Sequence, residues 1–132
     1  MVLVDTSVLI DFLRGADNKP VSRFQQILDN SLSFGITPLI YLEVLQGTRT
    51  EKDFAVVRDY LETHRFFGLR DAKESYAAAA RIYFDCRKKG IAINSTVDCL
   101  IAQTAIENDL ALLHNDADFE RMRKVAPLKI YE

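Results

Sequence analysis

The sequence predicts an α/β fold with three layers, in which helices cover both faces of a central, mainly parallel sheet. Short apolar runs alternate along the chain with segments whose apolar residues recur at helical spacing. The length of 132 residues is typical of one domain. The chain has only five Gly and three Pro residues and no Ser-rich or Pro-rich stretch. We therefore expect residues 1–132 to form a single domain without a linker.

The first elements are predicted from short-range patterns. Val2–Val4 is an apolar, mostly β-branched run, which indicates a buried strand. Asp5 and the two hydroxyl residues after it are typical of helix starts, and Gly15 is a suitable end for the helix that follows. Apolar residues share one face of Val21–Asn30, so a second helix is expected there.

The middle of the chain repeats this order. Ser33–Ile36 is expected to be a short strand. Thr37 before Pro38 is a favourable helix start, because proline is well tolerated at the first helical position, and this helix is expected to end near Gly47. Helical spacing then predicts another helix over Glu51–Thr63.

The last part of the chain alternates in the same way, and ligands of such sheets bind beyond the carboxyl ends of the strands. The expected elements are a strand at Phe66–Leu69, a helix at Asp71–Lys89, a helix from Ser95, a strand at Leu110–Leu113, a helix from Asn115 to Lys124, and a strand at Leu128–Tyr131.

Composition excludes several classes of protein. A hydrophobic fraction of 48% with a net charge of −2 is not that of a disordered chain. No apolar run approaches the ~20 residues of a membrane span, and the first residues lack the basic region of a signal peptide. Cys86 and Cys99 form no CxxC pair, so we expect reduced core thiols in a cytoplasmic protein without a membrane partner.

Carboxylates interrupt apolar sequence at a few places. Asp5 follows the first strand, Glu43 and Asp98 lie inside otherwise apolar helices, and Asp116 and Asp118 follow the strand that ends at residue 113. In a parallel sheet these residues can meet at one edge. Clustered carboxylates favour Mg²⁺ or Mn²⁺ over zinc, and neither histidine makes a zinc pattern with the cysteines.

Each acid also has an ordinary structural explanation. Asp5 can be a helix N-cap, and Asp116 and Asp118 can be first-turn acids that suit the helix dipole. Glu43 and Asp98 can lie at a solvated helix edge. The net charge of −2 does not exclude a nucleic-acid partner. If four of the acids hold a metal, the rest of the chain has a slight excess of positive charge.

An acidic pocket without a nucleotide-binding loop favours hydrolysis of phosphate esters. Neither a Walker-type loop nor GxGxxG is present. Bound metal can activate the attacking water and stabilise the charge on the leaving oxygen. A receiver-like signalling domain is an alternative, but it needs Asp at the end of a middle strand. No central strand is expected to end in Asp, although Lys129 matches the lysine of such domains. A dehalogenase-type phosphatase needs Asp-x-Asp after the first strand, which is absent.

Four segments in this order resemble PIN-domain ribonucleases, specifically VapC-type toxins of type II toxin–antitoxin pairs. The segments are Val2–Ile10, Leu42–Gly47, Asp98–Ala102 and Leu112–Phe119, and they extend over essentially the whole chain. The resemblance implies a PIN-like α/β/α fold and a magnesium- or manganese-dependent endoribonuclease that hydrolyses RNA phosphodiester bonds. A catalytically inactive PIN-like binding module remains an alternative.

The resemblance also implies roles for particular residues. The catalytic and metal-binding quartet would be Asp5, Glu43, Asp98 and Asp116. Thr6 or Ser7 would orient Asp5 or a phosphate oxygen, and Asp118 would support the metal ligands. Asn115 also belongs to this support, although many relatives have Thr or Ser at position 114 or 115.

The resemblance implies an RNA substrate, a homodimer and a cognate antitoxin, with promoter DNA bound only through the antitoxin complex. Each of three segments can form either a surface for a partner or an ordinary structural element. Arg81–Lys89 can contact RNA or end a helix with Tyr83 and Phe84 in the core. Tyr76–Ala80 can pack in the core or in a dimer. The apolar neighbourhood of Phe12, Leu13, Leu39 and Leu42 can be core or an antitoxin groove.

Overall fold

The computed structural model describes residues 1–132 and contains one sheet of five strands in the order β3-β2-β1-β4-β5. All four neighbouring pairs are parallel, which confirms the predicted parallel sheet. The strands are β1 (Val2–Val4), β2 (Phe34–Ile36), β3 (Arg65–Phe66), β4 (Ala111–Leu113) and β5 (Lys129–Ile130).

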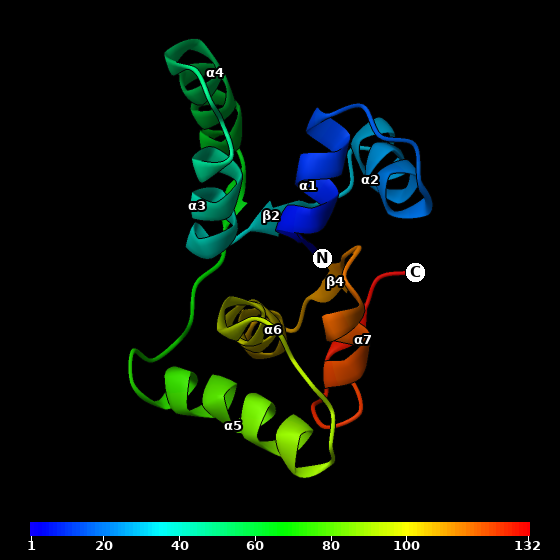
Figure 1. The fold of residues 1–132 in the computed structure, drawn as a ribbon. Helices are drawn as coiled ribbons and strands as arrows, with labels where there is room; N and C mark the ends of the chain where they lie inside the picture. Colours follow the sequence, from blue (N-terminus) through cyan, green and yellow to red (C-terminus); the bar gives the residue numbers. More distant parts are fainter.

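Seven helices cover the sheet, and the three-layer prediction is confirmed. In Figure 1, α1 to α4 lie in the upper half and α5 to α7 in the lower half, with β2 and β4 between them. None of the helices is long and apolar enough to cross a membrane. The helices are α1 (Thr6–Leu13), α2 (Lys19–Asp29), α3 (Pro38–Gln46), α4 (Glu51–Glu62), α5 (Glu74–Lys88), α6 (Thr96–Glu107) and α7 (Ala117–Met122).

The strand order creates a crevice at the carboxyl ends of β1 and β4. The chain moves outward from β1 through β2 to β3, then returns to the other side of β1 at β4. Right-handed crossovers in opposite directions place their helices on opposite faces and leave an opening where the direction reverses. At this point the Asp5 amide donates a 2.9 Å hydrogen bond to the carbonyl of Leu113.

Several boundaries differ from the predicted ones because of local capping. α2 begins earlier, at Lys19, since the Asn18 side chain accepts a hydrogen bond from the Val21 amide. α5 begins later, at Glu74, although Asp71 accepts from the Glu74 amide as expected of a cap. β3 pairs earlier than predicted, α7 ends at Met122, and the predicted last strand is shorter.

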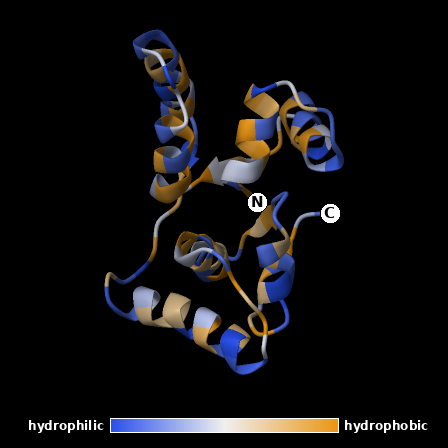
Figure 2. Cartoon of the chain, viewed as in Figure 1, coloured by the Kyte–Doolittle hydropathy of each residue, from blue (hydrophilic) through white to orange (hydrophobic).

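The core contains 27 buried hydrophobic residues between the sheet and the two helical layers. Figure 2 shows hydrophobic ribbon on α1 and α6 near the middle of the molecule and hydrophilic ribbon at the C-terminal end of α5. Cys86 and Cys99 are buried and unpaired, as predicted.

The surface of α5 contradicts one expectation. Tyr83 is 37% exposed and Phe84 is 45% exposed, so placing these rings in the core was wrong. Both rings lie beside arginine side chains of the same helix. Tyr76 is also exposed, while Ala79 is buried. The helix therefore packs against α6 through one buried face, which includes Ala79 and Ile82, and presents aromatic rings to its surroundings.

Gly35 in β2 allows β3 and the segment after it to approach closely. A Cβ atom there would lie 2.5 Å from Phe67 Cε2 and 2.6 Å from the Arg65 carbonyl oxygen. Gly35→Ala is expected to destabilise the protein by about 1–3 kcal/mol, because the backbone must shift. Gly68→Ala is the matched control, since nothing lies within 4 Å of its added Cβ. Equal melting temperatures for the two variants would contradict this packing.

Candidate active site

Asp5 has one bonded and one free carboxylate oxygen. It caps α1 in an extended backbone conformation, and its Oδ2 accepts hydrogen bonds from the Ser7 amide (3.0 Å) and the Ser7 hydroxyl (2.6 Å). Oδ1 is buried and has no hydrogen-bond partner. Burial raises the pKa of Asp5, the Ser7 bonds partly offset this, and Glu43 adds to the rise. Asp5 is therefore a helix N-cap through one carboxylate oxygen, and capping does not account for the buried position of the other oxygen.

Ser7 joins Asp5 to the loop that follows β4. Its hydroxyl donates to Asp5 and accepts from the Asn115 amide at 2.9 Å. Of the two hydroxyl residues expected near Asp5, Ser7 is therefore the one whose side chain reaches the carboxylate. The side-chain amide of Asn115 donates to Asp11 on α1 at 3.0 Å. Asn115 thus holds the loop against α1.

Glu43 is positioned by the contact between α3 and α1. Thr37 caps α3 by accepting from the Ile40 amide, and the helix buries Ile40 and Val44 on its inner face. Glu43 lies beside that face and is half-buried. The hydroxyl of Thr6 donates a 2.7 Å hydrogen bond to Glu43 Oε1. The Thr6 side chain therefore orients Glu43.

Asp98 is a buried carboxylate in the first turn of α6, and it is only 8% exposed. Its amide donates to the capping hydroxyl of Ser95 at 3.3 Å. Burial is the main cause that raises the pKa of Asp98 to about 8. The pKa is raised further by four neighbouring carboxylates, namely Asp5, Asp116, Glu43 and Asp118. The other three acids predicted from the sequence therefore lie within electrostatic reach of Asp98.

Asp116 follows β4 and caps α7. Its Oδ1 accepts from the Asp118 amide at 3.0 Å, and its own amide donates to His114 Nδ1 at 3.1 Å. Oxygen atoms of Asp98, Asp116 and Asp118 lie within 4.8 Å of one another. One metal ion could therefore take an oxygen from each of these three carboxylates.

Asp118 differs from the other acids because both of its oxygens have partners. Oδ1 accepts from Arg121 Nη1 at 2.7 Å, and Oδ2 accepts from the Asn94 amide at 3.0 Å. Asp118 therefore fixes the segment that leads into Ser95 and Asp98. The contact between Asp118 and Arg121, three residues further along α7, could be inferred from the sequence. The hydrogen bond from the Asn94 amide to Asp118 could not.

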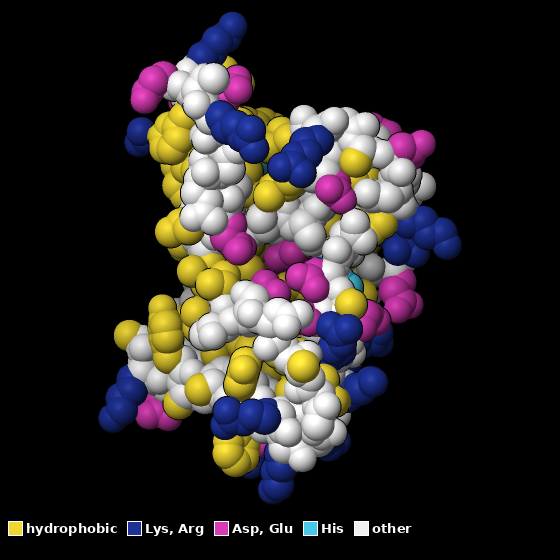
Figure 3. All heavy atoms as spheres, in the orientation of Figure 1, with side chains coloured by type: hydrophobic (Ala, Val, Ile, Leu, Met, Phe, Trp, Pro, Cys, Tyr) yellow, Lys and Arg dark blue, Asp and Glu magenta, His cyan; other side chains and the backbone are white.

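The site fits a divalent cation. Its donors are carboxylate oxygens, which magnesium and manganese prefer. The free Oδ1 of Asp5 and the raised pKa of Asp98 both indicate charge that a cation would neutralise. Figure 3 shows carboxylates gathered in a hollow in the middle of this face, with Lys and Arg atoms nearby.

Comparison with known proteins identifies the family. The profile of the PIN domain matches residues 2–125. The chain belongs to the PIN domain family. Ribonuclease VapC11 of Mycobacterium tuberculosis is 26% identical over 130 residues, which are 98% of this chain and 96% of that protein. The VapC ribonuclease Mb1587 of Mycobacterium bovis matches to the same extent.

Solved structures share this PIN domain's fold. The VapBC2 structure from Rickettsia felis, bound to a DNA fragment from its promoter, superimposes with a TM-score of 0.73 at 15% identity. That match covers 99% of this chain and 98% of the other chain. The VapBC-1 structure from nontypeable Haemophilus influenzae has a TM-score of 0.72 at 20% identity and covers 100% and 98% of the two chains.

β1 is the central strand of the sheet, and Asp5 follows it. The prediction that no middle strand ends in Asp, which spoke against a receiver-like domain, was therefore wrong. The central position of β1 could not be inferred from the order of the strands along the chain, because after β3 the chain crosses back to the other side of β1. The match to the PIN domain over residues 2–125 decides between the two families.

The raised pKa values predict how metal-free stability depends on pH. Asp98 binds its proton more tightly in the folded protein, at a pKa of about 8, than in the unfolded chain, where its pKa is near the ordinary 3.8. Its favourable contribution is complete below about pH 4 and is lost as pH rises through about 8. In EDTA, the melting temperature should therefore fall over this interval.

The Asp98→Asn variant should show a smaller fall in melting temperature between about pH 4 and pH 8 than the parent, and it should melt at a higher temperature than the parent at pH 8.5. A relief of ~1 kcal/mol corresponds to roughly 4 °C for a chain of this length. Asp59→Asn is the matched control, because Asp59 is exposed on α4. Parallel pH profiles for the parent and Asp98→Asn would show that Asp98 ionises freely.

Proposed function

We propose that this PIN domain is a divalent-metal-dependent endoribonuclease that acts as the toxin of a type II toxin–antitoxin pair. The observation that carries the proposal is the burial of Asp5 and Asp98 among further carboxylates at the sheet edge. The names of the matched ribonucleases support the activity. The titles of the VapBC structures support the pairing with an antitoxin.

Four residues would hold Mg²⁺ or Mn²⁺, namely Asp5, Glu43, Asp98 and Asp116. A bound ion supplies an activated water and stabilises charge on the leaving 3′-oxygen. The protein's own part is to fix the ligands before the substrate arrives. Ser7 holds one oxygen of Asp5 and leaves the other free. Thr6 holds one oxygen of Glu43, and Asp118 fixes the segment before α6.

The proposed partners follow from the same comparisons. We propose a cognate antitoxin, with promoter DNA bound only through the toxin–antitoxin complex. We also propose a homodimer, and the exposed rings of Tyr76 and Phe84 on α5 support a protein interface there. RNA is the proposed substrate.

Growth and cleavage together test the function. Expression of the chain alone is expected to arrest growth, and co-expression of the small protein encoded by the neighbouring gene is expected to restore it. Purified protein should cleave total cellular RNA with Mg²⁺ or Mn²⁺ and not in EDTA. Asp5→Asn should remove both effects, whereas Asp59→Asn should retain them. Arrest of equal strength with Asp5→Asn, without cleavage by the parent, would favour an inactive binding module.

A further inference from the structure

Three lysines meet where the end of α5 lies beside the turn that follows α7. Lys88 is the last residue of α5, Lys89 is its C-cap, and Lys124 lies just after α7. The ammonium group of Lys89 donates a 3.4 Å hydrogen bond to the carbonyl of Lys124. All three residues are exposed and line a hollow of about 490 Å³. They form what we call the lysine surface.

The lysine surface carries uncompensated positive charge. None of its three residues takes part in an ion pair. Asp85 also lines the hollow, but it pairs with Arg81 at 3.0 Å. Cations suit the dipole at the C-terminal end of a helix, which accounts for the two lysines of α5. It does not account for Lys124, which the fold brings there from another element.

Arg121 connects the lysine surface to the acidic site. Its Nη1 donates to Asp118 Oδ1 at 2.7 Å. Carboxylate oxygens of Asp118, Asp98 and Asp116 lie within 4.8 Å of one another. The Lys124 amide donates to the Arg121 carbonyl at 3.1 Å, and a turn of this type places residues three apart on the same side. Positive charge therefore continues from the carboxylates over Arg121 to Lys124.

A polyanion needs positive charge of this kind to approach the carboxylates. The chain as a whole has a net charge of −2, so local groups of basic residues must supply the attraction. In Figure 3, Lys and Arg atoms lie below the hollow that holds the carboxylates, on the side where Figure 1 places α7. Lysine is a compact charge on a flexible stem, which suits successive phosphates of a backbone better than one fixed anion.

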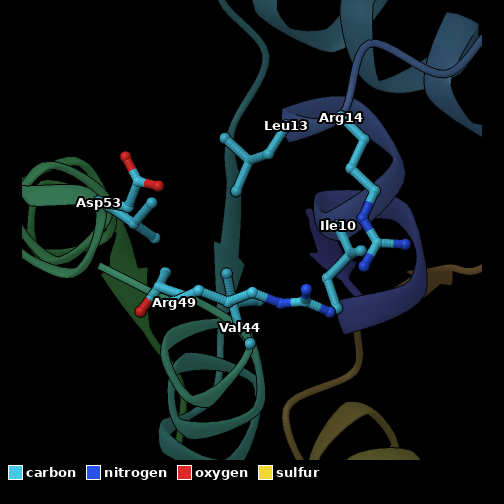
Figure 4. Close-up of a pocket in the computed structure, with 9 residues that line it drawn as sticks. Ile10, Leu13, Arg14, Val44, Arg49 and Asp53 are labelled. Atoms are coloured by element: carbon cyan, nitrogen blue, oxygen red, sulfur yellow. The ribbon is translucent and has the colours of Figure 1, made fainter. Parts of the chain in front are cut away.

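The cleft between α1 and the α3–α4 pair suits a different occupant. It has a volume of about 600 Å³, and Figure 4 shows Ile10, Leu13 and Val44 among the side chains around it. Leu13 is 43% exposed, and it belongs to the apolar neighbourhood that was expected to be either core or an antitoxin groove. Exposed apolar side chains favour a protein partner. A charged backbone gains little from such walls, which favours the lysine surface as the place for RNA.

We propose that the lysine surface binds the backbone of the RNA on one side of the phosphate that is cleaved. The inference rests on the proposed ribonuclease function and adds the path of the substrate strand, from the carboxylates past Arg121 and along α7 to the end of α5. RNA is favoured over an acidic segment of a protein because the positive charge begins at the carboxylates, where the substrate phosphate must lie. Phosphate contacts carry no sequence information, so this surface is expected to have no base preference.

A triple variant tests binding directly. The probe is a fluorescein-labelled single-stranded RNA of mixed sequence, titrated in EDTA so that it stays intact. Lys88→Gln, Lys89→Gln, Lys124→Gln should bind it roughly tenfold more weakly than the parent, because one exposed charge contact is worth about two- to threefold. The triple variant should also reduce the slope of log K against log salt by about 2, from about 0.7 for each phosphate on a single strand.

Two control variants separate the lysine surface from the net charge. Arg in place of the same three lysines keeps the charge, so affinity and salt slope should match those of the parent. Gln in place of three exposed lysines elsewhere changes the net charge equally but should weaken binding no more than about twofold. These are Lys19 on α2, Lys52 on α4 and Lys73 before α5, and none of them takes part in an ion pair.

Cleavage of total cellular RNA with Mn²⁺ provides the second readout. The Gln variant of the lysine surface should raise KM and leave kcat near that of the parent, because it removes binding and not chemistry. Melting temperatures show that each variant is folded. A purely structural role of the lysines would instead lower the melting temperature and leave KM unchanged.

The outcomes separate this inference from the proposed function. If the parent cleaves RNA and the Gln variant of the lysine surface binds and cleaves like the parent, the inference is wrong and the ribonuclease function stands. Equal losses in the variant with dispersed substitutions would also overturn it, since only net charge would matter. If the lysine surface is needed for the neighbouring gene's protein but not for RNA, it belongs to a protein partner and the inference is overturned. If the parent neither binds nor cleaves RNA, the proposed function fails and the inference fails with it.

Discussion

Replacing Asp5 or Asp98 by Asn is expected to lower metal-dependent RNA cleavage by on the order of a thousandfold, the scale for losing a group that stabilises transition-state charge. Asp5 offers a buried oxygen that no protein group satisfies, and Asp98 lies among four other carboxylates. Asn keeps the size of each side chain, and at position 5 it keeps an acceptor for Ser7. Initial rates on total cellular RNA at saturating Mn²⁺ measure the effect.

Asp59→Asn removes one carboxylate from the exposed face of α4 and should cleave like the parent. Circular dichroism and melting in EDTA show whether each variant is folded, and Asp98→Asn should be at least as stable as the parent. Parental rates in the double variant Asp5→Asn, Asp98→Asn would exclude these residues from the chemistry.

The meeting of the acids could be predicted from the sequence because it depends on topology. Asp5 and Asp116 each follow an apolar strand, and parallel strands bring their carboxyl ends to one edge. Glu43 and Asp98 could be predicted as site residues because apolar residues surround each of them in the sequence. The prediction needed only the alternation of strands and helices, which implies parallel strands, and the positions of the helix starts.

The bonding partners of these acids could not be predicted in the same way. Thr6 and Ser7 are adjacent, so they point about 100° apart around α1. Which of them reaches Asp5 depends on how α1 sits on the sheet and against α3. The bond from Thr6 to Glu43 joins residues 37 positions apart, and only the helix packing determines it.

Surface exposure was the other property that the sequence left open. Tyr83 and Phe84 occur in a helix with an apolar side, yet they lie on its outer side. Periodicity shows which residues share a helix face, but not which face another element covers.

Glu43→Gln is expected to lower Mn²⁺ affinity and RNA cleavage by about a hundredfold, as for a disturbed metal shell. The substitution keeps the shape of the side chain and an oxygen acceptor for Thr6, so it removes only the negative charge. The free energy of unfolding should change by no more than about 0.5 kcal/mol, because Glu43 is only half-buried. Titration of Mn²⁺ with cleavage as the readout measures the loss.

Two further variants show whether the charge or its orientation matters. Thr6→Val keeps the Glu43 carboxylate but removes the 2.7 Å bond that holds it, so it should have a smaller effect, about tenfold. Glu62→Gln, on the exposed side of α4, is the charge-matched control and should behave like the parent. If Glu43→Gln gave the parent's Mn²⁺ curve, the ion would be held by the remaining three acids, and Thr6 would serve only to pack α1 against α3.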